Sequence, residues 1–172
     1  MSTQAPGQEE QQDAYLDTSQ LSKLEAIGMA SGVLLFVSLF LPWFSTGSNP
    51  DSVIDTAGVG PNSSATAWQT FRVLDWLLLL LSFAPFILSW IIARRHTLDW
   101  PTGEVTMVTG LIGIFLVLCN GLILGKPKPG IQISLDIGWF LGLLGCIGIF
   151  FAGLMRQAEK TSTRGRKPPG TV

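Results

Sequence analysis

Charged residues are scarce in this chain. Asp, Glu, Lys and Arg make up 13% of the 172 residues, whereas a soluble domain carries about 25%. Hydrophobic residues account for 47%, and the mean hydropathy is +0.41. This shortage of charge argues against an ordinary soluble domain and favours an integral membrane protein.

Cysteine and histidine are scarce as well, with only Cys119, Cys146 and His96. The two cysteines lie at depths that differ by roughly 8 Å along their expected helices, too far apart for a disulfide, so we expect two free thiols. No Asp, Glu, Lys, Arg or His falls in the middle of an apolar segment, which argues against an ion-coupled transporter and a membrane hydrolase. We therefore expect no catalytic residue, no metal site and no cofactor.

Long apolar runs, by contrast, are plentiful. Four segments, at about residues 24–44, 73–93, 105–125 and 135–155, each span roughly 20 residues, enough to cross a bilayer. They are predicted to be helices, because lipid offers no hydrogen bonds to the backbone. The expected fold class is all-α: a polytopic membrane four-helix bundle over residues 22–155.

Basic residues indicate an orientation for this bundle. Eight Lys and Arg belong to the N-terminal segment, the loop after the second helix and the C-terminal end, and three belong to the opposite side. Since cytoplasmic loops carry the excess of basic residues, both termini are predicted to be cytoplasmic. Residues 1–21, acidic and Gln-rich, and 156–172, basic, are expected to be flexible tails. Residues 45–71 become a long extracytoplasmic loop.

Small residues recur at helical spacing on three of the four segments. Pairs of glycines four positions apart let helix backbones approach closely in lipid. They predict either packing within the bundle or docking of a partner protein. Pro85 is expected to kink the second helix. The glycine pairs are Gly28 and Gly32, Gly121 and Gly125, and Gly138 and Gly142.

The residues that lead into the second helix form the main candidate site. Trp68 and Trp76 suit the membrane interface, and Arg72 and Asp75 are spaced to pair on the surface of the first helical turn. An Asp so close to lipid is costly unless it is paired. The stretch is therefore either a membrane anchor or a docking site for a partner, with Trp68, Arg72, Asp75 and Trp76 as its candidate residues.

Weaker local signals accompany these. Residues 22–25, Ser-Lys-Leu-Glu, match a capping box at the start of the first helix. In the long loop, residues 52–55 are compatible with a short strand. Asp51 and Asp55 are two acids without a third ligand, which makes a weak cation site.

Two motifs carry a family resemblance: Leu41-Pro42-Trp43 at the end of the first helix, and residues 67–75, AWQTFRVLD, before the second. The pattern resembles small, largely uncharacterised four-helix membrane proteins of actinobacteria, over residues 22–155, and this resemblance implies a source and a topology rather than an activity. The long first and short second outer loops also resemble the layout of claudin-like proteins, although the paired loop cysteines of that family are lacking here.

We expect a multi-pass protein of the plasma membrane that is not an enzyme. The leading hypothesis is an accessory or structural subunit of a larger membrane or cell-envelope assembly, such as a respiratory complex. Its expected partners are the lipid bilayer and other membrane subunits or further copies of itself, and not nucleic acid. The alternative is a component of a small-molecule or lipid transporter or channel, for which Asn120, Ser38 and Ser82 offer the polar groups.

Overall fold

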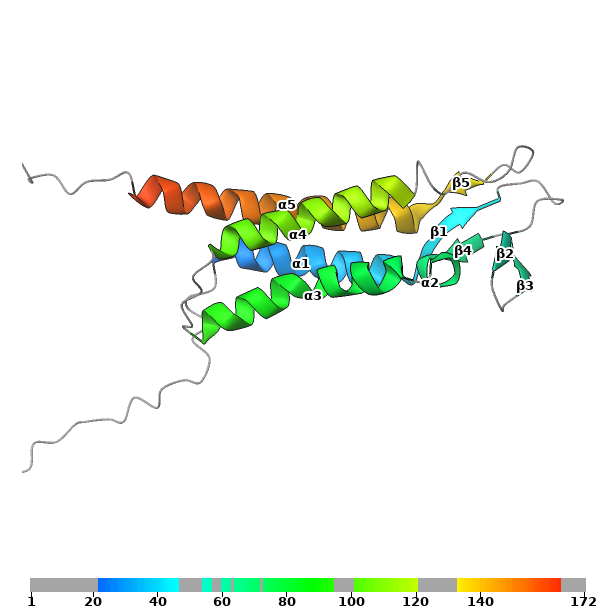
Figure 1. Ribbon diagram of the computed structural model, residues 1–172, viewed down its shortest axis with the longest axis horizontal. Coiled ribbons are helices and arrows are strands. Elements are labelled where there is room, and N and C mark those ends of the chain that lie inside the picture. Colours follow the sequence, from blue (N-terminus) through cyan, green and yellow to red (C-terminus); the bar gives the residue numbers. More distant parts are fainter. Residues whose placement is uncertain are drawn as a thin grey trace, which may run out of the picture.

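The computed structural model describes residues 22–46, 54–56, 60–62, 64–71, 73–94, 101–120 and 133–164, and this part of the chain is mostly helical. Four long helices run side by side in Figure 1, and a single-turn helix, α2, precedes the second of them. The bounds are α1 Lys23–Ser38, α2 Ala67–Thr70, α3 Leu74–Ala93, α4 Thr102–Leu118 and α5 Ile137–Arg164.

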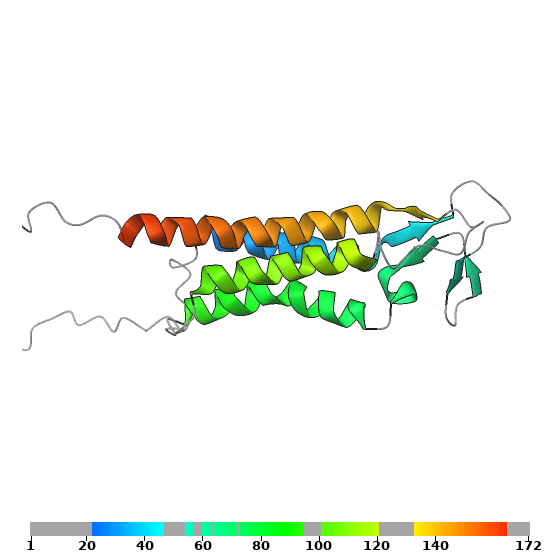
Figure 2. The ribbon, with the colours of Figure 1, turned by 45° about the horizontal axis from the view of Figure 1, so that its top comes forward.

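Each long helix packs against two neighbours. The α4–α5 and α1–α5 interfaces are the most extensive, while α3 fits against α1 and α4, and Figures 1 and 2 show the same arrangement from two sides. Among the described residues, two helices are long and apolar enough to cross a membrane, over Leu74–Ala93 and Ile137–Glu159, and Thr102–Leu118 is apolar but shorter.

Two small antiparallel sheets lie at one end of the helices, which we call the sheet end (Figure 1). The first places β1 between β4 and β5, with Phe44 opposite both Ala65 and Leu135. The second pairs β2 with β3, so the short strand expected near Ile54 is present in the described part of the loop. The strands are β1 Pro42–Ser45, β2 Ile54–Thr56, β3 Gly60–Asn62, β4 Ser64–Thr66 and β5 Ser134–Leu135.

The first helix ends at Ser38, not near Phe44 as predicted. Pro42 has no N–H to continue the helical hydrogen bonds, and it disfavours a helical conformation at the residue before it. The backbone therefore turns at Leu39 and Phe40 and continues as β1. The apolar run from Leu39 to Phe44 is a turn followed by the central strand of a sheet.

The last helix is longer than predicted and continues to Arg164. Residues 156–164 were expected to belong to a flexible tail, but Gln157, Ala158 and Glu159 are good or moderate helix formers. Gln157 Nε2 also donates to Glu104 Oε1 of α4 at 3.1 Å. The third predicted helix is α4, which begins at Thr102, before its apolar run, and ends at Leu118. A wide turn at Cys119 and Asn120 follows it.

The hydrophobic core lies where the helices meet the first sheet. Its members come from the four long helices, α2, β1 and the turn after α1, and most of their side chains are large. Toward the opposite end, which we call the charged end after Glu25 and Arg156, the buried positions are mainly glycine, serine, threonine and alanine. The core cluster comprises Leu35, Leu39, Trp43, Phe44, Ala67, Leu74, Leu78, Val117, Trp139, Cys146 and Ile149.

Candidate functional site

Asp75 lies inside the sheet end rather than on the helix surface, where the sequence placed it. It is in the first turn of α3, on the face that also buries Leu78 and Ser82, and it is 2% exposed. Its Oδ1 oxygen has no hydrogen-bond partner among the residues that the structure describes. A carboxylate near a helix N-terminus is favoured by the helix dipole, but burial without a partner costs free energy.

Trp68 supplies a second buried polar atom at the same end. It lies on α2, and its Nε1 is buried and has no acceptor within the described part of the chain. Its ring contacts Trp76 edge to face, with centroids 5.6 Å apart, and Phe40 at 6.0 Å. Phe40 and Trp76 are 57% and 64% exposed, and Trp68 is half-buried between them and the core. The three rings form a largely exposed aromatic patch, which we call the Trp68 patch.

Arg72 is not among the described residues, so its pairing with Asp75 stays a prediction. The structure brings Trp68 and Trp76 together through their rings, as part of one surface. The candidate stretch therefore combines an exposed aromatic surface with a donor and an acceptor that the described chain leaves unpaired.

Two other tryptophans are buried rather than interfacial. Trp43 is fully buried, and its Nε1 donates to Ser38 O at 2.7 Å. Trp139 is 5% exposed, and its Nε1 donates to Val117 O at 3.2 Å. Both acceptors belong to the last turns of helices, whose carbonyls have no partner within the helix. Nothing in the sequence indicated this role, because the acceptors lie on other turns or another helix.

The described glycines of the three pairs face other elements of the same chain, which are helices for Gly28, Gly32 and Gly142 and β1 for Gly138. A Cβ on Gly32 would lie 2.6 Å from Ser82 O, and one on Gly28 would touch Pro85 and Ala152. On α5, a Cβ on Gly138 would lie 2.6 Å from Trp43 Cδ1, and one on Gly142 would lie 3.0 Å from Ser38 Oγ. These four glycines therefore allow close packing within the chain, and Gly121 and Gly125 lie outside the described residues.

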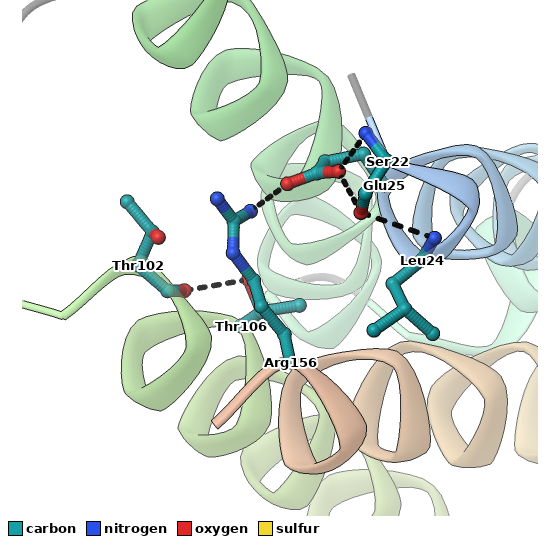
Figure 3. A network of polar contacts seen from close by, with 6 residues as sticks. All are labelled: Ser22, Leu24, Glu25, Thr102, Thr106 and Arg156. Carbon is teal, nitrogen blue, oxygen red and sulfur yellow. Dashed lines mark hydrogen bonds and ion pairs between the residues drawn. The ribbon is translucent and has the colours of Figure 1, made fainter. Parts of the chain in front are cut away.

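At the charged end, Glu25 links two helices. Ser22 and Glu25 form the predicted capping box at the start of α1, which is confirmed. In this box Glu25 Oε2 accepts from Ser22 N. Glu25 Oε1 pairs with Nη1 of Arg156 on α5 (Figure 3). The side chains of Glu25 and Arg156 are 4% and 16% exposed. The signal for this pair was available in the sequence: both residues lie at the same boundary of the predicted bundle and carry opposite charges.

Buried hydroxyl groups within the helices mostly bond to their own backbone. Ser38, Ser82 and Thr106 donate to the carbonyls of Leu35, Leu79 and Thr102, at 2.6, 2.6 and 2.9 Å. Asn120 donates in the same way to Leu116 O at 2.9 Å. The two cysteines are free thiols, as predicted.

Comparison with known protein families, with curated proteins and with solved structures finds no match to this chain. Within the described residues, no three His, Cys, Asp or Glu side chains come together as a group that could hold a metal ion.

Proposed function

We propose that this protein is a non-enzymatic, four-helix integral membrane protein, and that it serves as an accessory subunit of a larger membrane or cell-envelope assembly. In this proposal α1, α3, α4 and α5 cross the plasma membrane, both termini are cytoplasmic, and the sheet end faces the outside. The excess of basic residues at the charged end supports this orientation.

The distribution of apolar side chains supports the proposed location in a membrane. All four long helices expose large hydrophobic residues on their outer faces, while toward the charged end the faces between helices carry mainly small ones. In water, such a surface would be a very large apolar patch, whereas in lipid it meets a matching solvent. Examples are Ile27 and Val37 on α1, Leu80 and Phe83 on α3, Leu111 and Phe115 on α4, and Phe140 and Leu144 on α5, all between 46% and 66% exposed.

The observation that carries the accessory role is the pair of unsatisfied polar atoms at the sheet end. Trp68 offers a donor and Asp75 an acceptor, and the exposed Trp68 patch lies beside them. Aromatic residues are enriched at protein interfaces, and a polar group from a partner subunit would remove the cost of burying these atoms unpaired. The transporter alternative is less well supported, because Ser38, Ser82 and Asn120 use their polar groups on their own helices.

The test is affinity purification of the full-length protein from its native membrane, followed by mass spectrometry. We expect specific membrane subunits to co-purify with the unmodified chain. The Asp75→Ala variant should recover at least about tenfold less of them, the equivalent of about 1.4 kcal/mol. Asp51→Ala, which removes an acid from the long loop, is the matched control and should recover normal amounts.

Two results would contradict the proposal. One is a protein that runs as a lone monomer in mild detergent and brings nothing with it. The other is equal recovery by the Asp75 and Asp51 variants, which would leave the Trp68 patch as a membrane anchor. Circular dichroism of both purified variants checks that a loss of recovery is not a loss of fold.

A further inference from the structure

A small cavity lies near the charged end, where all four long helices contribute to its wall. It has a volume of about 20 Å³ and is lined by the Glu25–Arg156 ion pair, Pro85 and Ser89 of α3, and Thr106 of α4. A polar cavity needs roughly 10–15 Å³ to hold one water molecule, and two to four polar partners. This cavity meets both conditions.

Ser89 is the wall residue whose hydroxyl is not used elsewhere. It is 5% exposed, and none of the hydrogen bonds among the described residues engages its side chain. A helical serine commonly donates to the carbonyl four positions before it, as Thr106 does to Thr102 O at 2.9 Å. Ser89 Oγ is not among the fully buried atoms without a partner, and Ser89 lines the cavity, so its hydroxyl is free to bond to a ligand there.

The other polar groups of the wall define what that ligand is. Thr106 has its hydrogen committed to Thr102, so its oxygen is left as an acceptor. Arg156 uses Nη1 for Glu25 (Figure 3), and a guanidinium has further N–H donors. The positive and negative charges of the ion pair offset each other, so the wall favours neither a cation nor an anion. A ligand that both donates and accepts, and that is no larger than one water, matches this set.

We propose that the cavity is a binding site for a single ordered water molecule, held by Ser89, Thr106 and the Glu25–Arg156 ion pair. The water joins α3 and α4 to the ion pair that links α1 and α5. Ser89 lies one turn beyond Pro85, and Pro85 has no N–H to donate a backbone hydrogen bond within α3. The site thus fixes the charged end of α3, which lies far from the large side chains of the core cluster. It does not rest on the proposed role as an accessory subunit.

The substitution Ser89→Ala tests the site by the sign of its effect. If a water is bound, Ser89→Ala removes one of its partners, and Tm should fall by roughly 2–4 °C. If the cavity is dry, the same change removes a hydroxyl that bonds to nothing, and Tm should stay the same or rise, which would overturn the proposal. Ser82→Ala is the control on the same helix, because Ser82 bonds within α3; its effect should be smaller than that of Ser89→Ala.

A second measurement detects the ligand directly. In the full-length protein in lipid nanodiscs, water-selected NMR cross-relaxation should connect a long-lived water to the side-chain protons of Ser89 and Thr106. The cross-peaks should persist in Ser82→Ala and weaken in Ser89→Ala. Absence of such peaks in the unmodified protein would overturn the proposal even if Ser89→Ala lowered Tm.

Discussion

The two ends of the helical body are held together in different ways. At the sheet end, large side chains such as Trp43, Leu39 and Trp139 fill the space between helices, and indole N–H groups close the ends of α1 and α4. At the charged end, the helices approach through glycines, and an ion pair joins α1 to α5.

The same four apolar helices therefore pack in two ways, through large side chains at one end and through close backbone contact at the other. Where the chain leaves the helices and returns as strands, bulky residues are sheltered by the sheet, and their area stabilises the fold. Where lipid would surround the helices, burying an apolar side chain gains little over leaving it in lipid, so close backbone contact and polar bonds must hold them.

The strongest test of this difference is Trp43→Ala. Trp43 is fully buried, contacts Phe71 edge to face at 6.0 Å, and caps α1 through Ser38. We expect the free energy of unfolding to fall by about 4 kcal/mol, from the lost burial and the cavity left behind. Denaturation by SDS in mixed micelles, followed by circular dichroism, measures the change. Trp76→Ala, at a residue 64% exposed, is the control and should cost below about 1 kcal/mol; equal losses would contradict a core centred on Trp43.

At the charged end, Gly153→Val tests close helix approach. A Cβ on Gly153 would lie 2.8 Å from both Gly103 O and Met107 Cα of α4. Forcing these helices apart should cost about 2 kcal/mol in the same unfolding measurement. Ala158→Val, on the exposed face of α5, carries the same penalty for placing valine in a helix without the contact. If the two substitutions cost the same, the glycines do not set the distance between α4 and α5.

Much of the helical part of the fold could be predicted from the sequence, because an apolar run of about 20 residues is a long, redundant signal. The three-stranded sheet could not, because β1 is only Pro42–Ser45 and its partners β4 and β5 lie far along the chain. Pairing between short segments depends on tertiary contacts that no local pattern records. Pro42 was the one local signal that the first helix would stop early.

The candidate site was predicted in part. The sequence pointed to Trp68, Asp75 and Trp76, and the structure adds that Asp75 faces inward and Trp76 outward. Single residues cannot reveal this, because one step along a helix changes the facing direction by roughly 100°. The Glu25–Arg156 pair was missed for another reason: its two residues were assigned to separate local roles, a helix cap and a basic tail.

The smallest expected effect concerns that ion pair, and a double-mutant cycle isolates it. Glu25→Gln removes the charge and keeps a residue suited to the capping box, while Arg156→Met keeps the apolar stem. The coupling free energy between the two should be about 1 kcal/mol, because Arg156 is 16% exposed and water screens the attraction. The hydrogen bond from Gln157 to Glu104 gives a control cycle between α4 and α5 with Glu104→Ala and Gln157→Ala. This bond is exposed, so the coupling should be near zero. A coupling near zero for Glu25 and Arg156 as well would mean that glycine contacts alone hold α1 against α5 at the charged end. The contrast between the two ends would then rest on side-chain size, without any contribution from charge.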